Sequence, residues 1–327
     1  MNPRRVVKLA IDSLGLRPAF ERGLLESGLL GERLQYLFRT RPDPSEAILL
    51  AGSGRSGTTW VSDLLCQVPG TQRIFEPLRQ AARWQAPGTR PLFRSPYLRP
   101  EGEYTGWHAL LRDVLTGRCR TYWTDPSRTS FFPDRYLIKE IRANLMLGYI
   151  HNHFGSRIIH VLRHPCAVVA SRTRLKWRVD LDNLLQQEEL VEDELAGLTG
   201  DIQRAKSEAV ASHAIWWAVE NRVARRQLRG RAHFRAYYER LVSEPEQSLG
   251  AMLSWLGLDS DPIDGEKIRR SSRTTWSGGR GHDGQHSVPA LMSWKNQLSR
   301  DEQWVVLDWA YRLGVEDYGE EPLPVTT

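Results

Sequence analysis

The stretch LLAGSGRSGTTWVSDLL, residues 49–65, constrains the fold more than any other part of the sequence. An apolar run gives way to glycine, serine and threonine, and then apolar residues recur at helical spacing. The Gly52-x-x-x-x-Gly57 spacing is typical of a phosphate-binding loop. Glycines let the backbone approach a ligand closely, and the new helix points free N–H groups at an anion. The sequence therefore predicts a strand, an anion-binding loop and a helix.

The loop departs from that of nucleotide hydrolases at one position. After its second glycine such a loop carries lysine, whereas this chain has Thr58 and Thr59. Two later strand-like runs end near Lys139 and Arg163, where a Mg²⁺-dependent enzyme needs an acid. The pattern favours an anion held by arginine, lysine and a helix dipole without metal, and a phosphosulfate fits that description.

The rest of the chain alternates strand and helix patterns. We expect strands at 47–51, 135–140, 157–165 and 233–238 and helices at 58–68, 143–154, 165–177, 205–228 and 243–257. A capping box of Ser243 and Glu246 is expected to open the last of these helices. Alternation of this kind indicates a mainly parallel sheet. We predict one α/β domain over residues 1–327, with a three-layer, P-loop-like fold in which helices flank a central parallel sheet.

Three stretches interrupt this alternation: 83–106, rich in proline, glycine and arginine; 178–204, acidic and partly helical; and 276–292, rich in glycine and histidine. Long loops in a compact domain often cover active sites. We interpret all three as covers of a donor or acceptor site, and a plain surface insertion is the alternative for each.

Composition narrows the class of protein. The net charge is +6, and the basic residues are six lysines and 39 arginines. Arginine binds phosphate and sulfate through two parallel hydrogen bonds, so the arginines are consistent with a basic cleft for an anionic ligand. The alternative is a mildly basic, solvated surface. The three cysteines lack metal-site spacing and no apolar run would span a membrane. With no secretory signal at the start, we expect a cytoplasmic protein that binds neither a metal nor nucleic acid.

Three segments resemble the sulfotransferases that use 3′-phosphoadenosine 5′-phosphosulfate (PAPS). GRSGTTW resembles their 5′-phosphosulfate loop, VLRHPCAVVASR their 3′-phosphate motif, and YYERLVSEPEQSLGAMLSWLGL the strand end and helix that follow. The resemblance spans roughly residues 47–258, and Trp294-Lys295 extends it. Many cytosolic members of the family have lysine at the position of Arg55. An arginine at this position resembles the carbohydrate-modifying branch of the family more closely.

The resemblance implies a donor site and assigns residues to it. Arg163 and Ser171 would hold the 3′-phosphate, and Trp60 and Tyr238 would contact adenine. Taken singly, a surface ion pair for Arg163 and ordinary core packing for the two aromatic residues are the alternatives. The donor-binding set is Arg55, Ser56, Gly57, Thr58, Thr59, Trp60, Arg163, Ser171 and Tyr238. PAPS would be the co-substrate and 3′,5′-ADP the product.

Arg55, Lys139 and Glu76 are the predicted catalytic residues. Arg55 would stabilise charge on the bridging oxygen as the donor's S–O bond breaks. Lys139 and helix N–H groups would help to hold the sulfuryl and 5′-phosphate oxygens.

The base is less determined by the sequence. The histidine that serves in small-molecule sulfotransferases is replaced by Ile141. Glu76, after a probable strand end, is favoured as base, and Glu140 is the second candidate. A partly buried base with a raised pKa would suit the reaction. A structural ion pair, with Arg79 for Glu76 and with Arg142 for Glu140, is the alternative role.

The predicted reaction is sulfuryl transfer to an acceptor hydroxyl of a carbohydrate, a glycolipid or a small-molecule alcohol. A P-loop kinase or nucleotide hydrolase without the usual lysine is the second reading. The sequence leaves the acceptor and the oligomeric state open.

Overall fold

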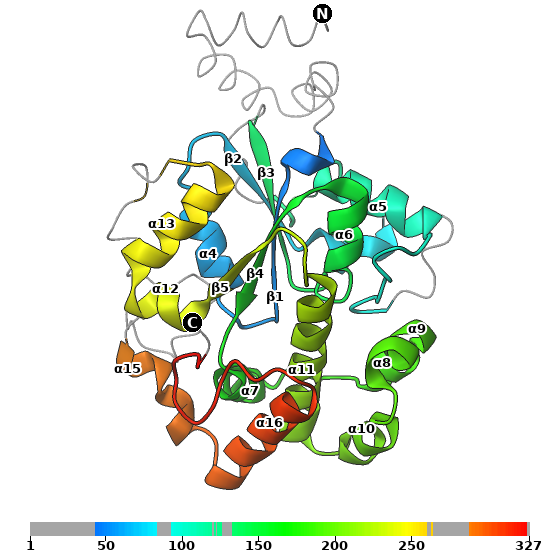
Figure 1. Cartoon of the computed structure of the whole chain (residues 1–327), viewed down its shortest axis with the longest axis vertical. Helices are drawn as coiled ribbons and strands as arrows, with labels where there is room; N and C mark the ends of the chain where they lie inside the picture. The colour runs from blue at the N-terminus through cyan, green and yellow to red at the C-terminus, as the bar shows by residue number, and fades with distance from the viewer. Residues whose placement is uncertain are drawn as a thin grey trace, which may run out of the picture.

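The computed structural model describes residues 43–83, 93–119, 121, 123–125, 133–259, 263 and 288–325. Its centre is a five-stranded sheet in which all strand pairs are parallel (Figure 1). The strand order is β2-β3-β1-β4-β5. The strands are β1 (Ile48–Gly52), β2 (Thr71–Phe75), β3 (Arg135–Glu140), β4 (Arg157–Leu162) and β5 (Phe234–Tyr237). The predicted α/β fold with a central parallel sheet is confirmed.

Alternating side chains of β1 bury both faces of the sheet. Ile48 and Leu50 pack with α4 (Thr58–Leu65) and α13 (Pro245–Leu256). Leu49 and Ala51 pack with α5 (Thr105–Leu115) and α6 (Leu147–Phe154) on the other face. Figure 1 shows these helix pairs on opposite sides of the strands. Period-two alternation between two apolar layers is what a central strand of a three-layer fold requires.

A third apolar cluster lies beyond the carboxyl ends of the strands. It joins α7 (Pro165–Arg174), α11 (Ala209–Gln227) and α16 (Arg300–Arg312). Four short elements of the acidic segment pack against it through Leu184, Leu190, Leu195 and Ile202, all fully buried. These elements are α8 (Asp182–Leu185), α9 (Glu188–Leu190), the π-helical turn η3 (Val191–Leu195) and α10 (Thr199–Ala205). Much of the segment 178–204 is therefore helical and anchored to the core.

The predicted capping box at Ser243 is wrong. Ser243 ends α12 (Tyr238–Ser243), and α13 begins after Glu244, whose side chain makes no capping hydrogen bond. Pro245 disfavours helical backbone at the preceding residue, so the serine and the glutamate fall on different helices. A true capping box lies instead at the start of α16, where Ser299 and Glu302 bond reciprocally.

Four short helices complete the described elements: η1 (Pro44–Glu46), η2 (Pro77–Arg83), α15 (Val288–Leu291) and η4 (Ser293–Asn296). In the described part of the chain, no helix has the length and apolar character needed to cross a membrane.

Candidate active site

The loop between β1 and α4 is shaped around Gly57. This residue caps α4 with φ of +86°, and a Cβ there would lie 2.4 Å from the Tyr238 ring. Only glycine combines that backbone with such a close approach. Next to it, the buried Ser56 Oγ has no hydrogen-bond partner in the described structure. The loop thus has free helix N–H groups and an unsatisfied hydroxyl at the carboxyl edge of the sheet.

Arg55 joins the loop to the second motif. Its Nε donates to Ser171 Oγ at 3.0 Å, and its carbonyl accepts from Arg163 Nη1 at 2.9 Å. Burial, and next the charge of Arg163, lowers the pKa of Arg55 to about 10. Three residues predicted to bind one nucleotide, from segments more than a hundred positions apart, therefore meet in one place.

Two aromatic side chains border this meeting point. The Arg163 guanidinium lies 4.2 Å from the centre of the Tyr238 ring, and Trp60 meets that ring edge-to-face at 5.8 Å. Trp60 and Tyr238 also belong to the core cluster around α4, so they pack as well as border the site. The buried Nε of Arg163 has no partner, and Arg163 forms no ion pair with a carboxylate of the described residues. The alternative role of Arg163, a surface ion pair, is therefore not found among the described residues.

The start of α7, which directly follows Arg163 and His164 in the chain, is held by side chains from later in the chain. Glu239 Oε1 accepts from the backbone N–H of His164 at 2.9 Å, and Tyr318 donates to Glu239 Oε2 at 2.6 Å. His164 caps α7 by accepting from Cys166 N–H, and its ring stacks on Trp294 at 4.4 Å. Burial lowers the pKa of His164 to about 4. The tryptophan that extended the sequence resemblance thus contacts the second motif.

Glu76 lies directly after β2 in a left-handed backbone conformation, with φ of +43°. Its Oε1 pairs with Lys139 Nζ, and its Oε2 accepts from Arg142 Nη1 at 3.1 Å. Burial favours the neutral acid, but the two cations outweigh it and lower the pKa of Glu76. The expectation of a raised pKa is wrong. Arg79 is not its partner, because that guanidinium lies over the Trp123 ring at 4.8 Å.

Glu140 occupies the opposite side of β3 from Lys139. Its two oxygens accept the backbone N–H groups of Leu78 and Arg142 at 2.7 and 3.0 Å, and the Arg142 guanidinium lies 3.6 Å away. The side chain is fully buried, which raises the pKa of Glu140. Two main-chain contacts make this carboxylate a brace between β3 and η2.

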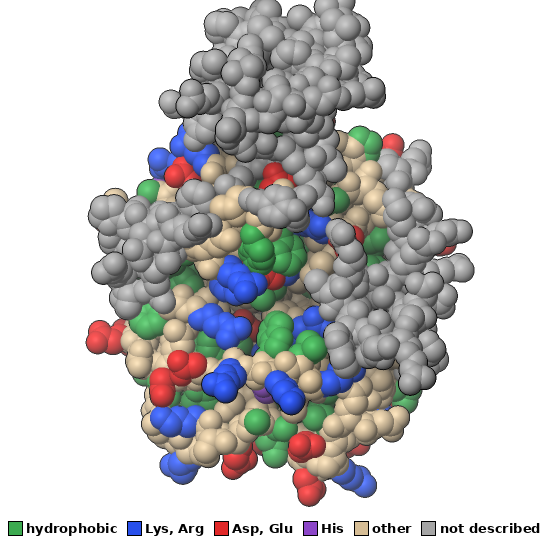
Figure 2. Space-filling view, turned by 180° about the vertical axis from the view of Figure 1, so that it is seen from behind, with side chains coloured by type: hydrophobic (Ala, Val, Ile, Leu, Met, Phe, Trp, Pro, Cys, Tyr) green, Lys and Arg blue, Asp and Glu red, His purple; other side chains and the backbone are tan. Residues whose placement is uncertain are grey.

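A narrow pocket opens beside Gly54 of the loop. Arg172 Nε donates to the Gly54 carbonyl at 3.1 Å, and Glu220 Oε2 accepts from Ser53 Oγ at 2.7 Å and from Arg172 Nη2 at 3.3 Å. The pocket is lined by Gly54, Arg94, Ser95, Ile141, Arg142, Arg172, Trp177, Val179, Trp216 and Glu220. Figure 2 shows one face of the molecule on which basic and hydrophobic side chains gather around a hollow.

Sequence reasoning missed most of this pocket. The predicted helix 205–228 contains Trp216 and Glu220, and the second motif ends at Arg172, but the sequence assigns none of them a role in a site. The missed residues come from α7, α11 and two of the predicted cover segments, so no local spacing connects them. Beyond the arginines of 83–106 and the adjacent tryptophans at 216 and 217, the sequence offers no local signal for them.

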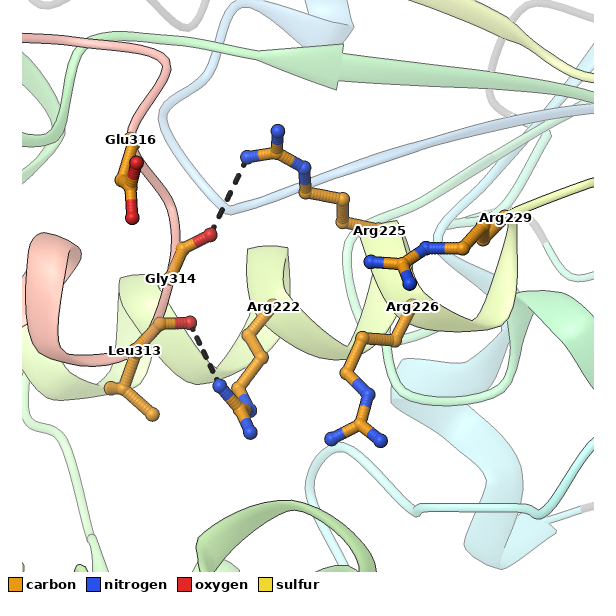
Figure 3. A pocket seen from close by; sticks show the side chains of 7 residues that line it. All are labelled: Arg222, Arg225, Arg226, Arg229, Leu313, Gly314 and Glu316. Atoms are coloured by element: carbon orange, nitrogen blue, oxygen red, sulfur yellow. Dashed lines mark hydrogen bonds between the residues drawn. The ribbon is translucent and has the colours of Figure 1, made fainter.

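A second pocket lies farther along α11, and its four arginines are labelled in Figure 3. Arg222 and Arg226 share Glu194 Oε2 at 3.0 and 3.1 Å, and Arg225 pairs with Asp317 at 2.8 Å. These pairs tie the helical segment and the C-terminal turn to α11. We therefore interpret this arginine cluster as a structural clamp.

Parts of the predicted covers, residues 84–92 and 276–287, lie outside the described residues. Among the residues that are described, no group of three histidine, cysteine or acidic side chains is arranged to hold a metal.

Comparisons with known proteins give a family. The model of the sulfotransferase family matches residues 47–262. Among solved structures, the sulfotransferase domain from the curacin biosynthetic pathway is 13% identical, with 85% of this chain and 99% of that chain covered and a TM-score of 0.47. The corresponding domain of the Synechococcus PCC 7002 olefin synthase is 17% identical, with 84% and 97% covered and a TM-score of 0.41. Mouse sulfotransferase SULT7A1 complexed with PAP is 15% identical, with 82% and 84% covered and a TM-score of 0.38. No curated protein matches this sequence.

Proposed function

Because the chain belongs to the sulfotransferase family, we propose that it transfers the sulfuryl group of PAPS to the hydroxyl of an acceptor. The observation that carries the proposal is the convergence of Arg55, Arg163 and Ser171 beside the start of α4. Two guanidinium groups, a hydroxyl and helix N–H groups suit a ligand with separate anionic groups.

The residues present fit such a ligand. Ser56 Oγ and Arg163 Nε are buried polar atoms without partners among the described residues, and a buried unsatisfied donor is costly unless a ligand completes it. Arg163 and Ser171 would hold the 3′-phosphate, while the backbone of residues 56–59 would hold the 5′-phosphosulfate. Trp60 and Tyr238 would border the adenine.

In the reaction, the acceptor oxygen forms a bond to sulfur, the S–O bond to the 5′-phosphate breaks, the hydroxyl proton leaves to a base, and 3′,5′-ADP is released. Glu76 is the proposed base, because it follows β2 beside Lys139 and Arg142 and is ionised at neutral pH; the two cations that lower its pKa also make it a weaker proton acceptor than a carboxylate in water. Arg55 would stabilise charge on the leaving oxygen. Lys139 would hold Glu76 in place and contribute positive charge near the sulfuryl oxygens.

The pocket beside Gly54 is the proposed acceptor site. The pocket itself has room for about one water, so a carbohydrate, glycolipid or small-molecule alcohol would bind at its mouth, where the rings of Trp177 and Trp216 form part of the wall. We also propose that residues 1–327 form one domain. The segments 83–106, 178–204 and 276–292 are proposed to cover its donor or acceptor site. The described cysteines are thiols, in keeping with the cytoplasmic setting that we propose.

The donor is tested by thermal unfolding with 3′,5′-ADP or with Mg-ATP. Selective stabilisation by the bisphosphate, lost in Arg163→Ala, is the expected result, because Arg163 supplies the 3′-phosphate contact. Equal or greater stabilisation by Mg-ATP would favour a kinase or hydrolase instead.

The base is tested by transfer from labelled PAPS to a panel of hydroxyl acceptors. Glu76→Gln should lower turnover by at least 10²-fold, in the range expected for general acid–base catalysis, with 3′,5′-ADP affinity retained. A Glu76→Gln protein with full turnover would remove Glu76 from this role and leave Glu140 as the candidate.

A further inference from the structure

The loop between β1 and α4 is attached to two helices by side chains that do not belong to the proposed donor site. Glu220 of α11 accepts from Ser53 Oγ at 2.7 Å through its Oε2. Arg172 of α7 donates from Nε to the Gly54 carbonyl at 3.1 Å. The same Glu220 oxygen accepts from Arg172 Nη2 at 3.3 Å, so the two attachments form one network. Two consecutive residues of the loop are therefore bound through a single carboxylate.

This network lies in the interior of the protein. Ser53 is 0% exposed, and Arg172 and Glu220 are each 2% exposed. Asn221 adds a further contact, because its Nδ2 donates to Ser53 Oγ at 3.3 Å. Burying an ion pair carries a desolvation cost that the attraction of the two charges offsets only in part. A buried network of hydrogen bonds does, however, restrict its members to one arrangement. The pair of Glu220 with Arg172 therefore suits the fixing of geometry better than the gain of stability.

The turn that this network fixes contains Arg55, the residue proposed to stabilise charge on the leaving oxygen. The Ser56 N–H donates to the Ser53 carbonyl at 3.0 Å and closes the turn around it. Arg55 has a φ of +81°, a conformation that costs energy in a residue other than glycine unless its surroundings impose it. Arg163 Nη1 holds the Arg55 carbonyl from the other side at 2.9 Å. The direction of the Arg55 side chain thus depends on where Ser53 is held.

We propose that Glu220 is a positioning residue for sulfuryl transfer. It acts through Ser53 and Arg172, which hold the turn so that the Arg55 guanidinium faces the bond between sulfur and the 5′-phosphate oxygen. Glu220 itself contacts neither the donor nor the acceptor. This inference rests on the proposed function and adds a residue to it.

The first test separates turnover from nucleotide binding in Glu220→Met, which keeps the length of the side chain but accepts no hydrogen bond. Transfer from labelled PAPS is measured at saturating donor, with the panel acceptor that the native protein sulfates fastest. Turnover should fall at least about tenfold, because a small displacement of Arg55 from the breaking bond is costly. The Kd for 3′,5′-ADP should change less than threefold, because Arg163, Ser171 and the N–H groups of α4 still hold its phosphates.

A milder variant tests the same contact without leaving Arg172 unpaired. Ser53→Ala removes the attachment of the turn to Glu220 but keeps the buried ion pair, so it tests the proposal even if Glu220→Met does not fold. Its turnover should fall at least about fivefold, again with 3′,5′-ADP affinity retained. In the double variant the second change should lower turnover less than a further twofold, because both substitutions break one contact.

Val223→Ala is the control for stability. This fully buried residue of the same helix packs in the cluster that joins α7, α11 and α16 and does not contact the turn. Its substitution should lower the midpoint of urea unfolding and leave turnover within twofold of the native value.

Three results would overturn the inference. They are native turnover in Ser53→Ala, a fall in 3′,5′-ADP affinity as large as the fall in turnover, and an equal loss of turnover in Val223→Ala. Failure of 3′,5′-ADP to stabilise the native protein, or of the native protein to transfer from PAPS to any acceptor, would instead overturn the proposed function.

Discussion

At the scale of single residues, Gly57 shows how backbone and side-chain demands combine. Gly57→Ala should weaken 3′,5′-ADP binding at least tenfold, because the new Cβ displaces the Tyr238 ring. Gly257→Ala is the matched control: its φ of +65° imposes similar strain, but nothing lies within 4 Å of the new Cβ. Both variants should lose about 1 kcal/mol of folding free energy from left-handed strain. Calorimetry and urea unfolding measure the two effects, and equal affinities in both variants would contradict this account.

His164 gives a prediction for pH. Its pKa is about 4 in the folded protein, against about 6.5 when unfolded, so the unfolded state takes up the proton first as pH falls. The stabilisation is complete above pH ~6.5 and decreases between that value and the folded pKa. Between pH 7.5 and 5.5 the native protein should lose about 1.3 kcal/mol more stability than His164→Asn, which keeps a capping acceptor. Parallel urea-unfolding curves for the two proteins would disprove the assignment.

At the scale of elements, the clamp on α11 carries a stability prediction. Glu194→Gln leaves Arg222 and Arg226 without their shared carboxylate, but both arginines remain partly solvated. The expected loss is therefore about 1–2 kcal/mol in urea unfolding, below that of a fully buried pair. Limited proteolysis should cut residues 180–205 faster in this variant. Asp182→Asn, which removes an exposed pair with Lys206 in the same segment, should change neither measurement.

Elements with strong local signals were predictable. The run 135–140 matches β3, and the long helix around residues 209–227 was expected because its apolar residues recur with helical spacing. Helices α5 and α16 were not predicted. The predicted capping box at Ser243 was wrong because Pro245 separates α12 from α13, so Ser243 and Glu246 lie on different helices. The wall of the Gly54 pocket had no sequence signature, because Arg94, Arg172 and Glu220 meet only through tertiary packing.

At the scale of the whole molecule, the proposed donor site joins three parts of the chain that contact one another through Arg55, Arg163 and Tyr238. A ligand at a hundredfold excess over its Kd should stabilise the native state by about 2.7 kcal/mol. Hydrogen exchange with 3′,5′-ADP should therefore slow together in the 53–60 loop, at the start of α7 and around Tyr238. Protection confined to the loop would show that Arg163 and Ser171 do not share the ligand.

The contact of Tyr318 with Glu239 links the carboxyl-terminal residues to the start of α7. Asp317 strengthens that link by accepting from Tyr237 and Arg225, at the end of β5 and on α11. A purification tag placed after residue 327 would pull on the groups that position the proposed 3′-phosphate site. If such a fusion bound the nucleotide weakly, the position of the tag would be the first cause to test. An amino-terminal tag is therefore the sounder choice.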